Sequence, residues 1–345
     1  MVVHPGGART LTSVSGLNTR RLCVAALSIL AVAIVYYAGA WLGLRDELLR
    51  RELTPLWPAS GVALVAILLF GNRVWPGIAI GSLLVHLSIG LSVPASVAIA
   101  AGSTLAPLCA AYLLRRVGFR FDCDRLRDAL ALVFLGAFAA MTVTATISTG
   151  VLVGTHVLPP HDWGITWLIS WSSNVMGVVV VAPVLLVARK LRLPAKVSAR
   201  RALEAGLLIG GTFAIAAVGT VSPFDVLFLV FPFLFWAAWR FQLTGAAPCV
   251  LVASLVVILA AEDGSGPFAG DSLLAKMVTM QAFVGSAALT ALLVAAVVAE
   301  RNHTYAEIEQ ACFRLADVMS LRDRAARHAQ SWHHSKPRES RTPLH

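Results

Sequence analysis

Few side chains within the long apolar stretches of this sequence carry groups that can do chemistry. His86 can exchange a proton near neutral pH, while Asn174 and Gln281 can hydrogen-bond a ligand enclosed by helices. Each also has an ordinary structural role, because polar side chains in membrane helices form interhelical hydrogen bonds worth ~0.6 kcal/mol on average. We therefore expect an interhelical hydrogen bond at Asn174, with a ligand contact as the alternative. For His86 and Gln281 we also favour a structural role over sensing.

Residues that would form a catalytic or metal site are sparse. Three acidic residues gather beside Gly266 and Pro267 and could bind a cation, although such charges are more often simply solvated: Glu262, Asp263 and Asp271. Three histidines lie in a polar segment without the fixed spacing of zinc ligands: His328, His333 and His334. The sequence contains no CxxC pair, P-loop, HExxH or GxSxG motif. We therefore predict no metal, no cofactor and no enzymatic activity.

The elements that must position these residues are membrane helices. Hydrophobic residues make up 58% of the chain and charged residues only 13%, whereas soluble domains carry about 25% charged residues. A spanning helix needs roughly 20 mostly apolar residues. Ten apolar runs lie at about 22–44, 53–70, 74–91, 93–114, 128–152, 163–188, 203–221, 224–239, 243–260 and 277–299. We predict an all-α polytopic bundle of about ten spans, with eight as the alternative.

The charged residues between the runs predict the orientation. With the N-terminus inside, 24 of the 28 Lys and Arg residues fall in inside segments. This asymmetry follows the positive-inside rule and predicts an inner-membrane protein with both termini in the cytoplasm. The net charge of +10 then indicates loops that face anionic lipid. No basic patch is interleaved with aromatic residues, so we predict no nucleic-acid partner.

Composition divides the chain into four segments. Residues 1–21 are expected to be a disordered cytoplasmic N-terminus, and residues 22–299 an integral-membrane domain. Residues 300–329 are expected to form a cytoplasmic helix, and residues 330–345 a disordered tail. The helix carries a coiled-coil seam with apolar spacings of 3, 4, 3 and 4: Tyr305, Ile308, Cys312, Leu315 and Met319. About 45 residues follow the last run, which is too few for a typical catalytic domain.

Two Trp-Pro pairs each open an apolar run, Trp57-Pro58 and Trp75-Pro76. Proline is tolerated in the first turn of a helix, and tryptophan prefers the membrane interface. The topology places Trp57 at the outer face and Trp75 at the inner face. Two GxxxG motifs predict close helix packing: Gly77-xxx-Gly81 and Gly206-xxx-Gly210. Five hydroxyl residues crowd the fifth run, where we expect bonds to helix carbonyls or neighbouring helices: Thr142, Thr144, Thr146, Ser148 and Thr149.

The order of these motifs resembles a known family. The stretch at 53–87, which also contains Gly61, is followed by Ala111-Tyr-Leu-Leu-Arg-Arg116. Next come Trp171-Ser-Ser-Asn174-Val-Met-Gly177 and Val-Ala-Pro183. Phe231-Pro232 with Trp236-Ala-Ala-Trp239-Arg-Phe241, and Gly264-Ser-Gly266-Pro267-Phe268, complete the set. Over roughly 25–300 the chain is similar to the membrane-associated sensor (MASE) domains of bacterial signalling proteins, of the first-described type.

The resemblance implies an integral-membrane input module that usually precedes a histidine kinase, diguanylate cyclase or phosphodiesterase. This chain has Asn174 where the family often has aspartate, and Ser103 and Ala106 where it often has Asn and Glu. From the short stretch after the last run we expect the usual output domain to be missing. The residues expected to contact a ligand or couple the signal are Trp57, Pro58, Gly61, Trp75, Pro76, His86, Trp171, Asn174, Gly177, Pro183, Gly266 and Pro267.

Three functions remain open from the sequence. The first is a sensory input module whose last helix passes a signal to a separate or missing output domain. Its partners would be the lipid bilayer, a second copy through the C-terminal helix, and a separate histidine kinase or diguanylate cyclase. The second is a small transporter or channel, although the Trp-Pro motif has no counterpart after residue 200. The third is a degenerate sensor remnant.

Overall fold

The computed structural model describes residues 11–50, 55–190, 199–222, 226–263, 266–268 and 273–334. These residues form helices, short turns and no strand, as predicted for an all-α protein. The described residues up to Val298 form one compact unit, and those from Ala299 form a second.

The first group of helices holds most of the candidate site. It comprises α1 (Leu11–Arg50), α2 (Pro58–Phe70), η1 (Asn72–Val74), α3 (Trp75–Ser88), α4 (Val93–Arg116), α5 (Leu126–Ala131), η2 (Leu132–Ala139), α6 (Ala140–Gly154), η3 (Pro160–Asp162), α7 (Trp163–Met176), η4 (Gly177–Val181) and α8 (Ala182–Lys190). The segments η2 and η4 are π-helical, so two long rods each contain one widened stretch.

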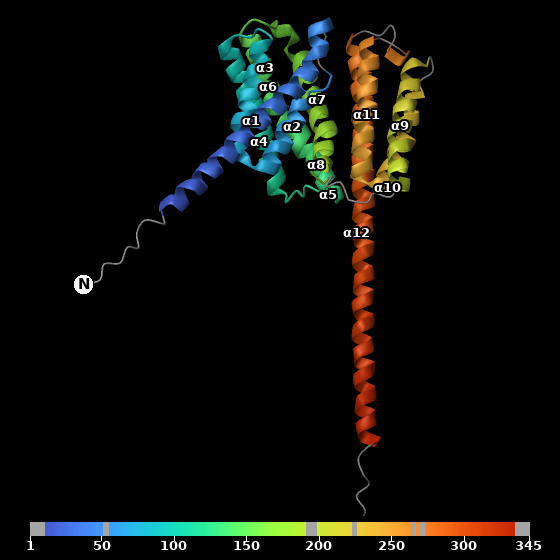
Figure 1. Cartoon of the computed structure of the whole chain (residues 1–345). Helices are drawn as coiled ribbons and strands as arrows, with labels where there is room; N and C mark the ends of the chain where they lie inside the picture. The colour runs from blue at the N-terminus through green and yellow to red at the C-terminus, as the bar shows by residue number, and fades with distance from the viewer. Residues whose placement is uncertain are drawn as a thin grey trace, which may run out of the picture. The chain divides into compact units, whose positions relative to one another are not determined.

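The second group packs beside the first through α11, which contacts α8 and η4 (Figure 1). It comprises α9 (Ala199–Val221), η5 (Val226–Leu229), α10 (Val230–Phe241), α11 (Leu243–Asp263), η6 (Gly266–Phe268) and α12 (Leu273–His334). Within this group α9 and α10 both pack against α11.

Every predicted apolar run coincides with a helix, but the helices differ in length. Among the described residues, seven helices are long and apolar enough to cross a membrane. The other three are α2 with 13 residues, α3 with 14 and α10 with 12. At 1.5 Å per residue such helices reach only about 20 Å, against a hydrocarbon core of about 30 Å. The structure therefore supports a multi-pass bundle, and the number of spans stays a prediction.

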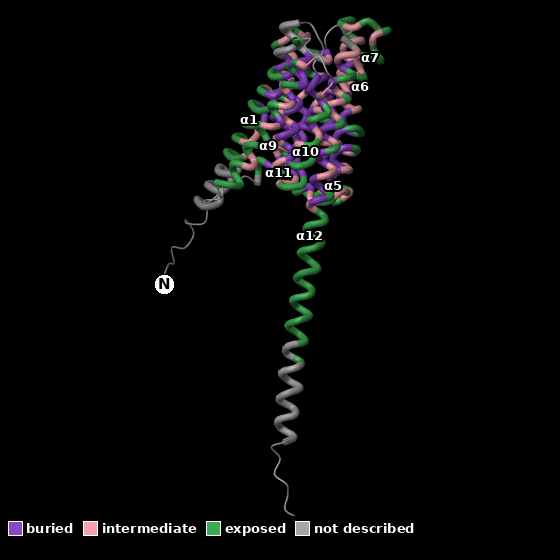
Figure 2. The backbone as a smooth tube through the Cα atoms, turned by 90° about the vertical axis from the view of Figure 1, so that its right-hand side faces the viewer, coloured by how far each residue is buried: buried purple, intermediate pink, exposed green. Residues whose placement is uncertain are grey.

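Burial follows the expectation for a bundle in lipid. Buried residues fill the interior of the part up to Val298, and exposed residues lie on its surface (Figure 2). Many of the exposed residues are large and apolar. The short helix α2 is enclosed, because all residues from Ala59 to Leu68 are buried. Because neighbouring helices cover α2, its apolar surface needs no contact with lipid, and the helix can be shorter than the membrane is thick.

The two GxxxG motifs have different outcomes. A Cβ atom on Gly77 would collide with the Ile29 carbonyl, and one on Gly81 would lie 2.9 Å from the Ala33 carbonyl. The close packing predicted there, between α3 and α1, is confirmed. Nothing lies within 4 Å of a Cβ atom built on Gly206 or Gly210. The prediction of close packing at the second motif is therefore wrong within the described residues, because α9 turns this face away from its neighbours.

Both ends of the chain are more helical than expected where the structure describes them. Helix α1 begins at Leu11, inside the stretch 1–21 that was expected to be disordered. Helix α12 runs to His334, beyond the predicted boundary at residue 329. The physical reason is cooperativity, because extending an existing helix fixes one residue per hydrogen bond and needs no new nucleus. Residues 1–10 and 335–345 lie outside the described residues.

Candidate functional site

Helix α2 starts against the backbone of α7. Pro58 is its first residue, and Trp57 precedes it with non-helical angles of φ −107° and ψ 87°. The Trp57 N–H donates to the Ser173 carbonyl at 3.1 Å. The Ser60 hydroxyl lies 2.8 Å from the Trp57 carbonyl and 2.9 Å from the Asn174 carbonyl. A helix start leaves unpaired N–H groups, and Pro58 removes one of them, so little polar backbone is left exposed to the apolar interior.

This contact places the first Trp-Pro pair deep in the bundle. Ser173 lies near the middle of the 30-residue helix Pro160–Arg189. Pro55 and Leu56, which lead to Trp57, are non-helical and buried. The expectation that Trp57 lies at the outer face is therefore wrong. Non-helical backbone at this depth is tolerated only where protein covers it, and here α1 and α7 lie beside α2.

Two glycines allow the helices to cross at backbone contact. A Cβ atom on Gly61 would collide with the Gly177 carbonyl, and one on Gly177 would collide with Trp57 O and Ser60 Oγ. Gly61 and Gly177 belong to motifs 116 positions apart in the sequence. The structure brings the two glycines together, and only as a pair do they allow the two backbones to approach this closely.

The crossing coincides with the π-helical segment η4. It begins at Gly177 and ends at Val181, just before Pro183. Proline lacks an N–H and clashes with the carbonyl four residues earlier in a regular helix. A widened turn relieves that clash, and π-helical turns occur frequently at functional sites. Gly177 and Pro183, both singled out by the sequence, therefore flank one irregular stretch.

A second polar group lies next to the crossing, centred on Tyr36 of α1. The Tyr36 side chain is 1% exposed, and its hydroxyl has hydrogen-bonding partners in Ser103, Ser82 and Trp57. We call Tyr36, Ser82, Ser103 and Trp57 the Tyr36 cluster. It joins α1, α3 and α4 to the start of α2. Sequence reasoning missed Tyr36, although a tyrosine inside an apolar run signals a buried hydroxyl that needs a partner.

Of the three polar residues singled out first, His86 and Asn174 have local roles. His86 Nδ1 lies 2.7 Å from the Ser82 carbonyl, one turn earlier in α3. The Asn174 amide donates to the Ser170 carbonyl at 2.8 Å, within α7 itself. The expected interhelical hydrogen bond at Asn174 is therefore made by its backbone carbonyl and not by its side chain. Gln281 Nε2 is buried and has no hydrogen-bond partner among the described residues, so its expected structural bond is not observed.

Trp171 belongs to an aromatic row on the surface of α7. Its ring stacks on Trp167 at 6.1 Å, and Trp167 stacks on Trp163 at 6.2 Å. Trp171 Nε1 donates to the Phe138 carbonyl in the π-helical segment η2 at 3.0 Å, and Trp167 Nε1 donates to Thr146 Oγ1 at 3.0 Å. In the fifth run, Thr142 and Ser148 donate to carbonyls of their own helix. The predicted structural role is confirmed for Thr142, Thr146 and Ser148, whereas Thr149 Oγ1 is buried and has no hydrogen-bond partner among the described residues.

The other end of α2 is held by Arg115 of α4. Arg115 donates to Asn72 Oδ1 at 2.8 Å and to the Ile67 carbonyl at 3.1 Å. The Ile67 carbonyl also accepts from the Gly71 N–H at 3.0 Å, so the guanidinium caps α2 with a second hydrogen bond to a carbonyl in its last turn. Gly71, with φ 81°, permits the sharp exit from the helix. This contact joins Arg115, at the end of the fourth apolar run, to the Gly71-Asn72-Arg73 turn between the second and third runs.

Four of the predicted residues lie away from the crossing. Trp75 and Pro76 open α3, where the Trp75 side chain is half exposed. Gly266 and Pro267 form part of η6, which packs against α9 and α11. Asp271 lies outside the described residues. Among the residues that the structure does describe, no three His, Cys, Asp or Glu side chains converge on a common point.

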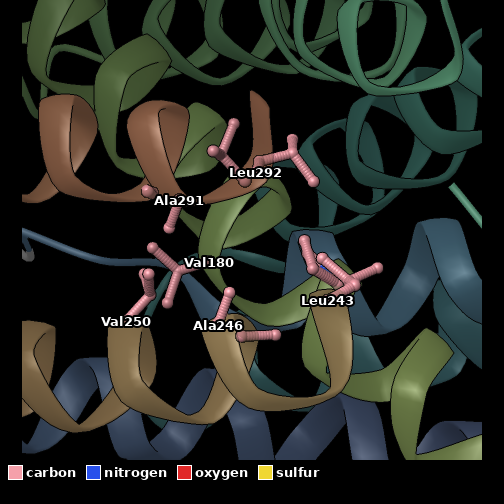
Figure 3. A pocket seen from close by; sticks show the side chains of 10 residues that line it. Val180, Leu243, Ala246, Val250, Ala291 and Leu292 are labelled. Carbon is pink, nitrogen blue, oxygen red and sulfur yellow. The ribbon is translucent and has the colours of Figure 1, made fainter. Parts of the chain in front are cut away.

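The segment η4 also packs on α11, and residues of η4, α11 and α12 line a common crevice. A Cβ atom on Gly285 of α12 would lie 2.9 Å from Met176 Cε. A narrow crevice of about 10 Å³ is lined by apolar side chains (Figure 3): Val179, Val180, Pro183, Leu243, Ala246, Ala247, Val250, Ala288, Ala291 and Leu292. A space of this size holds about one water at most, and water requires polar partners. The crevice is therefore a packing gap beside η4 and not a ligand pocket.

The comparisons with known proteins agree with this arrangement. The family model MASE1 matches residues 27–302, close to the 25–300 predicted from the motifs. Neither the curated proteins nor the solved structures contain a match to the chain. The matched range includes both glycines of the crossing, the Tyr36 cluster and the membrane part of α12. The chain therefore belongs to MASE1, a family of membrane-associated sensor domains.

Proposed function

We propose that this protein is a sensory input module whose signal leaves through α12 to a separate output protein. The observation that carries the proposal is the position of η4. It meets the start of α2 at Gly61 and Trp57, and Met176, the residue just before it at the end of α7, lies against Gly285 of α12. A displacement at the Tyr36 cluster therefore has a short packed route to the helix that continues beyond the bundle.

Packing supports transmission along this route. Protein interiors are close-packed and pass strain from one side chain to the next. At the crossing, the backbone of η4 and the backbone at the start of α2 lie against each other with no side chain between them. Neither backbone can therefore move alone. The π-helical stretch supplies the alternative geometry, because its turn can tighten or widen near Pro183.

Charge supports the remaining parts of the proposal. The Lys and Arg distribution favours a bacterial inner membrane with both termini in the cytoplasm, where the tail of α12 is accessible to a partner. A separate histidine kinase or diguanylate cyclase is the partner class that the family context favours. The family consists of sensory input domains, which carry no chemistry of their own.

The test uses two neighbouring positions on α12. Gly285→Ala adds a methyl group against Met176, whose flexible end can move, so the protein should fold and the coupling should change. Ser286→Ala is the matched control, because the Ser286 hydroxyl is exposed and bonds only to Phe283 of its own helix. We expect Gly285→Ala and deletion of 300–345 to change the cellular cyclic-di-GMP level or the phosphorylation of a partner kinase, with Ser286→Ala at the wild-type level.

The proposal fails if the deletion and Gly285→Ala leave both outputs at the wild-type level and co-purification recovers no signalling protein. That outcome would instead favour a degenerate sensor remnant. Each variant is first checked for membrane insertion and thermal unfolding, so that a loss of protein is not read as a loss of signal.

One observation favours a transporter as the second candidate. Helix α2 begins beside the middle of a span, and transporters build substrate sites from discontinuous helices with buried starts. Solute flux into proteoliposomes that Asn174→Ala or Thr146→Ala abolishes would establish this function. The sensor remains the first candidate, because the family and the contact with α12 both support it.

A further inference from the structure

The tail of α12, considered by itself, exposes a continuous apolar stripe. The exposed fractions are 59% for Tyr305, 54% for Ile308, 65% for Leu315 and 67% for Met319, and Cys312 is also exposed. We infer that this stripe pairs, in parallel and in register, with the same stripe of a second copy of the chain. The inference stands whether or not the protein is a sensor.

The spacing of the stripe is that of a coiled-coil seam and not that of an ordinary amphipathic helix. Intervals of 3, 4, 3 and 4 residues average 3.5, the repeat that keeps a seam facing its partner as two helices wind around each other. Tyr305, Cys312 and Met319 take one seam position of the heptad, and Ile308 and Leu315 take the other. Val318, which is 62% exposed, flanks the seam and widens it.

The flanking positions favour an identical partner. In a coiled coil, charges beside the seam choose the partner and its orientation. Here these positions carry Thr304, Ala311, Ala316 and Val318, with Glu309 as the charged exception. In a parallel pair Glu309 faces Thr304 of the second copy, so no like charges oppose each other. Identical chains thread the membrane identically, so both tails leave it on the same side and run in parallel.

The extent of the seam makes this pairing weak. Arg301 and Arg322 occupy the next seam positions before and after it, and a charged residue there limits apolar contact. Roughly 100 Å² from each seam side chain gives on the order of 1,000 Å² for the pair, at the lower limit for a specific interface. Confinement in one membrane raises the effective concentration of the two tails and compensates for this small area. The result is a reversible dimer, which a small change in α12 can open.

The experiment uses the full-length protein in native membranes and a short bis-maleimide cross-linker. We expect a covalent dimer through Cys312, reduced at least about fivefold in Cys312→Ser. In that background Leu315→Cys restores the cross-link, because it returns a thiol to the seam. Gln310→Cys is the matched control and gives no dimer, since residue 310 lies on the opposite face of the helix.

A second pair of variants tests the interface without cysteine placement. Leu315→Glu puts a charge into the seam and should reduce the Cys312 cross-link at least about fivefold, while Gln310→Glu leaves it unchanged. Thermal unfolding of each variant reports separately on the membrane part. Equal cross-linking at residues 310 and 315, or no dimer through Cys312, overturns the inference. Neither result bears on signal output, so the proposed function is tested independently.

Discussion

The close approach of η4 to the start of α2 at Gly177 yields a prediction with a matched control. In Gly177→Ala the new methyl group overlaps the Trp57 carbonyl and the Ser60 hydroxyl. Relieving the overlap moves α2 away by roughly 1 Å, and overpacking of this kind costs about 1–3 kcal/mol. The same movement stretches the Trp57–Ser173 and Ser60–Asn174 hydrogen bonds, now 3.1 and 2.9 Å. At ~0.6 kcal/mol each, their loss brings the expected total to about 2–4 kcal/mol.

The control is Gly150→Ala in α6, where nothing lies within 4 Å of the added methyl group. Alanine is the better helix former by about 1 kcal/mol, so this variant should be as stable as the wild type or more so. Both proteins are unfolded reversibly in mixed detergent micelles and followed by circular dichroism. If the two variants unfold within about 1 kcal/mol of each other, the crossing is looser than its geometry indicates and the reasoning fails.

Two further predictions concern the polar contacts around α2. Tyr36→Phe leaves the partners of the hydroxyl unsatisfied and should reduce the free energy of unfolding by about 1–2 kcal/mol. The control, Tyr37→Phe, should change this free energy little. Equal effects of the two substitutions would contradict the role of the Tyr36 cluster. Arg115→Ala removes the cap on α2 and should cost about 1 kcal/mol, measured in the same unfolding assay. Arg116→Ala, which loses only contacts with Tyr112 in its own helix, should stay within about 0.5 kcal/mol of the wild type.

The sequence was sufficient for what depends on local pattern. Apolar length identified the helices, and the order of the motifs identified the family. The depth of Trp57 was not predictable in this way, because a tryptophan before a helix start has the same local pattern at an interface and inside a bundle. Its position depends on Gly61 meeting Gly177, a contact between distant segments that neither motif encodes alone.

The two GxxxG motifs show the same limit of prediction from a local sequence pattern. Gly77-xxx-Gly81 packs on a backbone carbonyl of α1, whereas Gly206-xxx-Gly210 meets nothing within 4 Å. The spacing places both glycines on one helix face in each case, but it does not say which face the fold turns inward. Tyr36 was missed for a related reason, since its partners come from three other segments. Pro183 signalled an irregular helix, but only the structure shows that the wider turn lies beside α2.

Helix α2 is anchored at both ends, by Ser173 and Asn174 at its start and by Arg115 at its end. Its 13 residues form a strut of about 20 Å whose internal hydrogen bonds resist both stretching and compression. A strut fixed in this way cannot absorb a change in the distance between the middle of α7 and the end of α4. It can only tilt, and we expect such a tilt to displace the start of α2 against η4.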